Sequence, residues 1–499
     1  MGKVPLCVQL FQKLDIPQSS KNTIYKFSAL VLTYISYTSY HMARKPLSVV
    51  KNSEEFVNCS QSVCSSWVDQ LDGKPEDQTK TILGLLDTTY LVCYAFFTFL
   101  SGPVADRVDL RVFLTVGMVG SGLFTAMFGL AYRARVHSIW YFFCVQALTG
   151  LFHTTGWPGV LTVVANWFQK DRKGFIMGAW YSHASVGNIL GAISAGIFAD
   201  DNWGLSFIIP GLIMMVVGVL LFLFLVPDPA MVDIDPHSCL LSTTSSSEDS
   251  LITSDRKTTS SFLNTRKGES EPLLDQTKEV IGFWRALKIP GVVEYSLCLF
   301  FAKLVLYTFM YWLPNYINDT SHYDASSSAN LSTFFDVGGI FGAVLVGLIS
   351  DWTGYSASTC VSMFLLSLPS MILYQNLQSD WCPLSQVDGL PAFNSCYILN
   401  CILLFLTGVL VNGPYALIMT VVSSDLGTHH TLKGSKKAMA TVSAIIEGTA
   451  SIGAAVGPSL AGWLAGDGDW GKVFGMMMGA DAAAAVLLGR VVIREIKNK

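Results

Sequence analysis

Charged residues are scarce in this sequence. Asp, Glu, Lys and Arg make up 14% of its 499 residues, against about 25% in an ordinary soluble domain, while 51% are hydrophobic. The formal net charge of −4 is small, so the sequence suggests no nucleic-acid partner. Both a large soluble domain and a nucleic-acid-binding protein are therefore disfavoured.

Several chemical motifs are missing as well. The sequence contains 11 cysteines, but none stands at a metal-ligand spacing or in a catalytic arrangement with histidine. No glycine-rich phosphate loop ending in Lys-Ser or Lys-Thr is present, so ATP-driven chemistry is not indicated. Because no nucleophile and base cluster either, the sequence predicts no cofactor and no metal, and it disfavours a membrane-bound enzyme acting on phosphate esters.

Long apolar runs are abundant instead. About twelve segments approach the 20 residues that a helix needs to cross a bilayer. Their approximate spans are 24–46, 82–102, 112–132, 139–167, 174–199, 205–226, 291–317, 330–350, 358–376, 396–423, 437–465 and 471–493. The sequence thus predicts an all-α polytopic membrane protein. The N-terminus lacks a signal-peptide core and cleavage site, so the first span is expected to act as an uncleaved insertion signal.

Residues 227–281 differ from everything around them. They are rich in Ser and Thr, carry scattered charges and hold too few apolar residues for a core. This composition predicts a disordered cytosolic linker. It separates an N-terminal half, residues 1–226, from a C-terminal half, residues 282–499, with six predicted spans in each.

The two halves share a repeated pattern of glycines in their fifth spans. The glycines are Gly187, Gly191 and Gly196 in the first half and Gly453, Gly457 and Gly462 in the second. Small residues at this spacing let helix backbones approach closely. Duplicated six-helix halves around a site at the bilayer midplane are the architecture of a secondary transporter.

The distribution of Lys and Arg predicts the orientation. These residues gather after spans 2, 4 and 10 and in the C-terminal tail, and they are absent after spans 5, 7 and 9. Both termini are therefore expected in the cytosol, although Lys51 and Arg133 run against the count. Residues 52–80 then face the other side, where Asn58 in Asn-Cys-Ser is a predicted glycosylation site.

One stretch at the end of the first span carries unusual chemistry. At helical spacing, Tyr37, Tyr40 and Arg44 share one face and Lys45 lies beside it, while Pro46 is expected to bend or break the helix. Two explanations stand at this point. The cations either snorkel to the headgroups at a helix end, or they form an anion site ringed by phenolic hydroxyls.

A third cation favours the anion site. Lys303 lies about nine residues inside the seventh span, too deep to snorkel easily, with Tyr307 and Tyr311 on its face. Cations from the first helix of each half would meet near the pseudo-twofold axis. Two cations with phenolic donors suit a small dianion such as a phosphate ester.

Other polar residues inside the spans have less specific interpretations. Asp336 and Glu447 are interpreted as partners of the cations. His153 and His183 are either hydrogen-bonded core histidines or residues of the site.

Taken together, these motifs resemble a known family. Gly102, Asp106, Arg107 and Arg111 resemble the loop signature of the major facilitator superfamily. The Arg44-Lys45 pair resembles that of the organophosphate:phosphate antiporters. The stretches most similar to the sugar-phosphate exchangers of solute carrier family 37 are 40–46, 174–191, 289–314, 331–342, 425–433 and 448–462. The resemblance implies a major facilitator fold and exchange of glucose 6-phosphate for inorganic phosphate across the endoplasmic reticulum membrane.

The resemblance also implies roles for individual residues. Arg44 matches the phosphate-binding arginine of the first helix, and Lys303 and His183 are its expected companions. Lys45 and Asp336 are expected to form a gating pair between the halves. Residues expected to line the cavity are Tyr37, Tyr40, His153, Tyr307, Tyr311 and Asn412.

Alternatives stay open at this level. One is a proton-coupled carrier of another organic anion, with Asp87, Glu447 or the histidines as relays. Another is a sensor that has a transporter fold but does not transport. An acidic dileucine pattern at Leu273 and Leu274 makes an endolysosomal membrane the alternative location. The sequence does not fix the oligomeric state.

Overall fold

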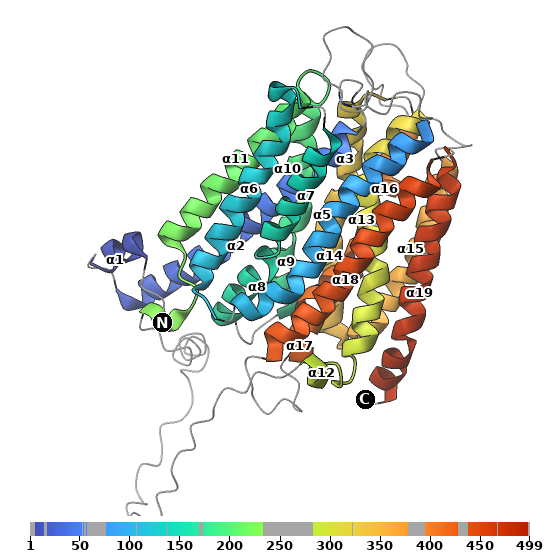
Figure 1. Cartoon of the computed structure of the whole chain (residues 1–499). Helices are drawn as coiled ribbons and strands as arrows, with labels where there is room; N and C mark the ends of the chain where they lie inside the picture. Colours follow the sequence, from blue (N-terminus) through green and yellow to red (C-terminus); the bar gives the residue numbers. More distant parts are fainter. Residues whose placement is uncertain are drawn as a thin grey trace, which may run out of the picture.

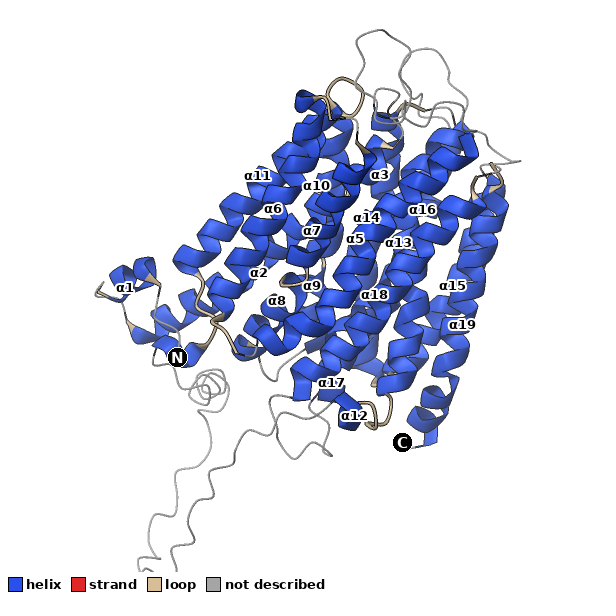
Figure 2. Cartoon of the chain, viewed as in Figure 1, coloured by secondary structure: helices blue, strands red, loops and turns tan. Residues whose placement is uncertain are grey.

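The computed structural model is a bundle of helices that run alongside one another (Figure 1). It describes residues 5–13, 17–51, 53, 56, 76–105, 107–136, 138–168, 173–232, 283–321, 323–377, 395–427, 438–466 and 468–497. Within these ranges the secondary structure is helical and contains no strand (Figure 2).

Each predicted span coincides with helix. The first half contains α1 (Leu6–Gln12), α2 (Gln18–Arg44), α3 (Pro46–Val50), α5 (Glu76–Ala105), α6 (Leu110–Ala134), α7 (Ile139–His153), α8 (Gly156–Trp167), α9 (Lys173–Tyr181), α10 (His183–Phe198), α11 (Trp203–Phe224) and the 3-10 helix η2 (Pro229–Val232). The second half contains α12 (Phe283–Ala286), α13 (Val292–Ser321), α14 (Ala325–Thr353), α15 (Ser356–Asn376), α16 (Ser395–Leu417), the π-helical turn η5 (Ile418–Val422), α17 (Ser423–Gly427), α18 (Ala438–Leu464) and α19 (Trp470–Lys497).

Nine helices in the described part of the chain are long and apolar enough to cross a membrane. The other three predicted spans are also helical, but they are either polar or interrupted. The first span, α2, is rich in Tyr, Ser and Thr. The fourth is divided into α7 and α8, and the fifth into α9 and α10.

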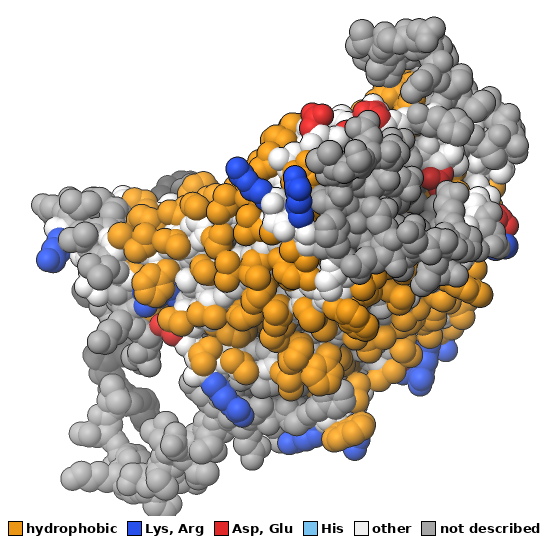
Figure 3. All heavy atoms as spheres, turned by 45° about the horizontal axis from the view of Figure 1, so that its top comes forward, with side chains coloured by type: hydrophobic (Ala, Val, Ile, Leu, Met, Phe, Trp, Pro, Cys, Tyr) orange, Lys and Arg blue, Asp and Glu red, His pale blue; other side chains and the backbone are white. Residues whose placement is uncertain are grey.

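The outer face of the bundle is largely hydrophobic. Figure 3 shows apolar side chains covering much of the visible surface, with Lys and Arg mostly toward its margins. Large exposed apolar residues include Phe96, Val216, Leu365, Trp463 and Val486. Meanwhile Arg44, Lys45, Lys303 and Asp336 are buried. An apolar exterior around a polar interior is the arrangement that a lipid bilayer requires.

The repeated glycines position equivalent helices in the two halves. A Cβ on Gly187 or Gly191 would lie only 2.4 or 2.6 Å from backbone oxygens of α2. A Cβ on Gly453 or Gly457 would lie 2.0 or 2.5 Å from backbone oxygens of α13. Since α10 packs on α2 as α18 packs on α13, the two halves share the close helix packing that a duplication predicts.

The halves meet mainly where α5 packs on α18 and where α9 and α10 pack on α14. Helix α3 lies at one end of the bundle, whereas α12, α17 and the C-terminal end of α19 lie at the other, together with α1 (Figure 1). Both termini therefore approach the same end of the bundle.

At two places the helical chain extends a few residues past the approximate predicted boundaries. Helix α2 stops at Arg44 and α3 starts at Pro46, which confirms the predicted break. The chain nevertheless stays helical and buried as far as Val50, so the first span extends beyond 24–46. The first half likewise continues past 226, because η2 follows α11 and Val232 is buried in the core. Residues 233–281 of the predicted linker lie outside the described residues.

Candidate functional site

Arg44 is buried, and its partners among the described residues are neutral phenols from both halves. Its Nη1 donates to the hydroxyl of Tyr307 on α13 at 2.8 Å. The guanidinium carbon lies 4.9 Å from the ring centroid of Tyr94 and 6.0 Å from that of Tyr90, both on α5. Within the described ranges, no carboxylate forms an ion pair with Arg44, and its Nε has no hydrogen-bond partner.

The burial of the two adjacent cations distinguishes snorkelling to the headgroups from an internal anion site. The side chains of Arg44 and Lys45 are 6% and 1% exposed, inside the bundle rather than at its surface. Snorkelling to the headgroups is therefore wrong for both. A buried guanidinium needs hydrogen-bond acceptors and a counter-charge, so an anion from solution is the natural partner for Arg44.

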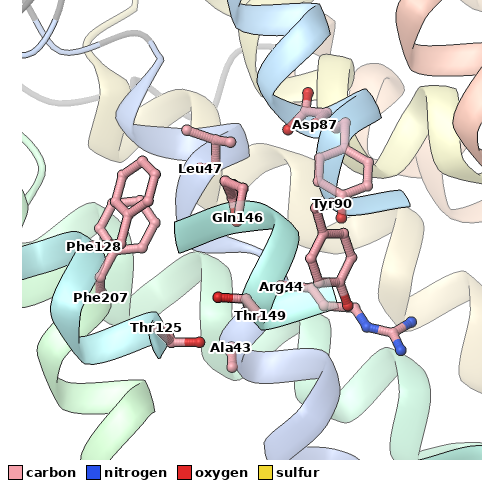
Figure 4. A pocket seen from close by; sticks show the side chains of 11 residues that line it. Ala43, Arg44, Leu47, Asp87, Tyr90, Thr125, Phe128, Gln146, Thr149 and Phe207 are labelled. Atoms are coloured by element: carbon pink, nitrogen blue, oxygen red, sulfur yellow. The ribbon is translucent and has the colours of Figure 1, made fainter. Parts of the chain in front are cut away.

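Arg44 also lines a small cavity of about 20 Å³ together with Asp87 and Tyr90 (Figure 4). The Tyr90 hydroxyl has no hydrogen-bond partner among the described residues. Tyr311 of α13 lines the same cavity, and its ring centroid lies 6.0 Å from that of Tyr307. Tyr307 and Tyr311, two of the phenols predicted to line the cavity, thus lie near this cation.

Lys303, unlike Arg44, has a carboxylate partner. Its Nζ lies 2.6 Å from Oε1 of Glu447 on α18 and donates to the Ser451 hydroxyl at 3.1 Å. The Tyr94 hydroxyl donates to the same carboxylate oxygen at 3.1 Å. Glu447 is therefore the partner of a cation, as the sequence indicated, and Lys303 is neutralised within its own half. The role of Lys303 in binding phosphate stays a prediction.

Lys45 joins the two halves. Its Nζ donates to the backbone oxygen of Met310 on α13 at 2.9 Å and lies 3.9 Å from Oδ2 of Asp336 on α14. Asn188 of α10 donates to the other oxygen of Asp336 at 2.8 Å and contacts His41 at 3.2 Å. The predicted pair is thus in contact across the two halves.

A second ion pair was missed by the sequence analysis. Lys51, treated there as a loop residue, is buried and forms an ion pair with Asp87 of α5. Its Nζ also lies 4.2 Å from the ring centroid of Trp312 on α13. The sequence signal was present in Asp87, an acid inside an apolar span, but nothing in the sequence pointed to Lys51 as its partner.

His183 lies in a cage of aromatic rings at the start of α10. The nearest ring centroids are those of Trp180, Tyr37 and Tyr181, at 4.5, 4.7 and 5.4 Å. Neither ring nitrogen has a hydrogen-bond partner in the described part of the chain. The contact with Tyr37 places His183 beside the face of α2 that ends in Arg44, and its contact with phosphate remains a prediction.

Comparison with known proteins decides the family. The model of the Major Facilitator Superfamily matches residues 76–435. The glucose-6-phosphate exchanger SLC37A2 of Danio rerio is 46% identical over 497 residues, covering 97% of this chain and 95% of the relative. The protein of the same name in Homo sapiens is 45% identical over 493 residues, covering 96% and 94%. A putative glycerol-3-phosphate transporter 1 of Arabidopsis thaliana is 40% identical over 525 residues, covering 100% and 94%.

This chain belongs to the major facilitator superfamily and, within it, to the sugar-phosphate exchangers of solute carrier family 37. The predicted all-α fold is thereby confirmed. This family member is a multi-pass membrane protein, and its chain spans nearly the full length of these relatives.

His153 and Tyr40, both predicted to line the cavity, form hydrogen bonds with neighbouring helices. His153 contacts the Ser121 hydroxyl at 2.5 Å through Nδ1 and the backbone oxygen of Tyr40 at 3.1 Å through Nε2. Both nitrogens therefore brace α7 against α6 and α2, and the place of His153 in the cavity wall stays a prediction. The Tyr40 hydroxyl is likewise bonded to Thr155, at 3.0 Å.

Asn412 lies where α16 packs on α14. Its Nδ2 donates to the Gly408 carbonyl of its own helix at 3.0 Å. A Cβ on Gly339 of α14 would lie 2.9 Å from the amide carbon of Asn412. Asn412 thus takes part in the close packing of α16 on α14, and its place in the cavity wall stays a prediction.

Three of the four predicted residues of the superfamily's loop signature, Gly102, Arg107 and Arg111, are among the described residues. Gly102 is buried near the end of α5, where an added Cβ would lie 3.5 Å from Ala444 of α18 in the other half. Arg107 is exposed, and Arg111 lies 3.8 Å from Asp109, the residue that caps α6. The predictions for Asp106 and Asn58 lie outside the described residues.

Proposed function

We propose that this chain is an antiporter that exchanges a sugar phosphate, most simply glucose 6-phosphate, for inorganic phosphate. The relatives named as glucose-6-phosphate exchangers support this substrate class. The name of the plant relative, which specifies glycerol 3-phosphate, also denotes a small organic phosphate.

The observation that carries the proposal is the environment of Arg44. A guanidinium presents two parallel N–H groups that match two oxygens of a phosphoryl group. Here it is buried, it has a phenolic partner in Tyr307, and no carboxylate within the described ranges neutralises it. A phosphate dianion would supply the missing charge, and the Tyr90 hydroxyl could donate to it.

The same environment explains why transport would be obligatory exchange. An empty site leaves the charge of Arg44 uncompensated in the low-dielectric interior, which opposes reorientation of the halves. A bound phosphate removes that penalty. The contacts of Lys45 with Met310 and Asp336 then loosen as the halves rock, and they form again when the site empties.

Exchange in reconstituted vesicles tests this function. Vesicles preloaded with phosphate should take up labelled phosphate and labelled glucose 6-phosphate, and vesicles without internal phosphate should take up neither. Uptake driven by a proton gradient without internal phosphate would instead identify a proton-coupled carrier. The sugar phosphate taken up should be chemically unchanged, because antiport breaks no bond; chromatography of the vesicle contents checks this.

For location we propose the endoplasmic reticulum membrane, with both termini and the linker in the cytosol and Asn58 glycosylated on the opposite side. The count of Lys and Arg supports this orientation. Glycosidase treatment should increase the gel mobility of the wild type but leave Asn58→Gln unchanged. A C-terminal tag that is protected from protease in sealed vesicles of known orientation would contradict this topology.

A further inference from the structure

A second small cavity lies next to the cations, between the two halves. Thr98 of α5, residues 157–162 of α8 and residues 443–447 of α18 contribute to its wall, and its volume is about 30 Å³. Ser443 lies about one and a half turns into α18, near the end of the bundle that carries α12 and α17 (Figure 1). The cavity therefore lies toward the end of the bundle that carries α12 and α17.

Three polar atoms on this wall have no hydrogen-bond partner within the described ranges. They are Nε1 of Trp157, Oγ of Ser443 and Oε2 of Glu447. The three residues are 3%, 7% and 2% exposed. Buried polar atoms without partners are rare in folded proteins because each is energetically costly. One donor, one hydroxyl and one carboxylate acceptor around one cavity indicate a ligand with hydroxyl groups.

Glu447 connects the wall of this cavity to Lys303 of the predicted phosphate site. One oxygen of this carboxylate accepts from Lys303 at 2.6 Å and from Tyr94 at 3.1 Å, while the other has no partner. On the opposite wall, the ring centroid of Trp157 lies 5.4 Å from that of Tyr37, which shares a helix face with Arg44. A ligand whose phosphate binds Arg44 would therefore direct its carbon skeleton toward this cavity.

The composition of the wall suits the neutral part of such a ligand. No Lys or Arg is among its lining residues, all of which belong to the described chain. Pro158 and Leu161 supply an apolar surface beside the three polar atoms. A sugar ring presents the same combination of C–H faces and hydroxyl edges.

We propose that Trp157, Ser443 and Glu447 form the subsite for the hydroxylated carbon skeleton of the transported sugar phosphate. The indole N–H donates to a sugar hydroxyl, and the carboxylate oxygen accepts from another. This inference rests on the proposed function. At about 30 Å³ the cavity is closer to the size of a water molecule than of a sugar ring, so the ring enters when α8 and α18 separate. These helices belong to opposite halves, so the rocking of alternating access widens the cavity.

The test measures the exchange of glucose 6-phosphate and the exchange of inorganic phosphate separately. Vesicles carrying Trp157→Phe or Ser443→Ala are assayed for phosphate self-exchange and for exchange of phosphate with glucose 6-phosphate. Each variant should raise the half-saturation concentration for glucose 6-phosphate roughly threefold to tenfold, because one hydrogen bond is lost. Phosphate self-exchange should change less than twofold, which also shows that the variant is folded. Deoxyglucose 6-phosphates then identify the hydroxyl, because Trp157→Phe should remove the preference of the wild type for one parent hydroxyl.

Trp180→Phe is the matched control. Trp180 is as buried as Trp157, but its indole N–H donates to Thr33 at 3.3 Å and it does not line the cavity. Its replacement should shift both half-saturation concentrations by the same factor. Equal shifts for phosphate and glucose 6-phosphate in Trp157→Phe and Ser443→Ala would overturn the subsite and leave the proposed function standing. A wild type that exchanges phosphate but carries no organic phosphate would overturn both.

Discussion

Arg44 and Lys303 occupy comparable places in the two halves, yet their surroundings differ. Each lies in the first long helix of its half, and each has tyrosine rings within about 6 Å of its charge. Arg44 donates to a phenol of the other half, whereas Lys303 pairs with the carboxylate of Glu447 in its own half. The two cations therefore lie in corresponding helices, about one turn apart in register, and they have different partners.

Because of this difference, the two cations should contribute unequally to phosphate binding. An incoming phosphate can take the free side of the Arg44 guanidinium without displacing another anion. To reach Lys303 it must compete with a carboxylate only 2.6 Å away. We therefore infer that the first half provides the permanent anion site, and that Lys303 contributes its charge only when Glu447 shifts away.

The largest effect is expected for a substitution of Lys303, the cation that has a carboxylate partner. Lys303→Met leaves the Glu447 carboxylate buried without a counter-charge, which should reduce stability by about 3–5 kcal/mol. The double variant Lys303→Met/Glu447→Gln should recover most of this loss. Thermal unfolding in detergent without substrate measures both. A single variant as stable as the wild type would show that the pair does not compensate the buried charges.

The next largest effect is expected for Arg44→Lys, which changes the cation that has no carboxylate partner among the described residues. Lysine keeps the charge but removes the planar fork that binds two phosphoryl oxygens. Losing this contact should weaken phosphate binding by a few kcal/mol, roughly a hundredfold or more in half-saturation. Glucose 6-phosphate should be affected equally, because it presents the same group.

Phosphate self-exchange, normalised to folded protein, measures the effect of Arg44→Lys. Arg133→Lys at the exposed end of α6 is the control and should behave as the wild type. Near-normal rate and half-saturation in Arg44→Lys would mean that Arg44 is not the phosphate fork, and the site would have to be placed elsewhere.

A smaller effect is expected where the two halves are joined. Lys45 and Asp336 are 3.9 Å apart and each has a further partner, so their coupling should be weaker than that of Lys303 and Glu447. Asp336→Asn should slow exchange about tenfold, and adding Lys45→Met should slow it little further, because coupled residues are not additive. Exchange rates of the two single variants and the double variant measure the coupling. Strictly multiplicative rates would show that the pair does not act as one gate.

The smallest effect is expected for a deletion within the predicted linker. Deleting residues 240–275, which lie between the halves and outside the described residues, should change phosphate exchange less than twofold. Their Ser- and Thr-rich composition supplies no core. Initial rates in vesicles with matched protein content measure this. A severalfold loss would give the linker a part in transport.

The sequence by itself determined the class of this protein. Apolar runs of bilayer length, two glycine triplets at equal spacing and a linker without apolar content predicted a duplicated helical transporter, because each feature is local. The cations were visible for the same reason: Arg44 and Lys303 are conspicuous inside apolar spans. The resemblance then indicated the substrate class.

Only the tertiary structure decided which charges are paired. Lys51 lies 36 residues from Asp87, and Lys303 lies 144 residues from Glu447, so no local pattern could join them. It also showed that both nitrogens of His153 are used in packing and that Trp157 lies beside Glu447 in one cavity. Whether a buried cation is free for a ligand depends on what the packing of distant helices places within a few ångströms of it, because hydrogen bonds and ion pairs form only at contact distances.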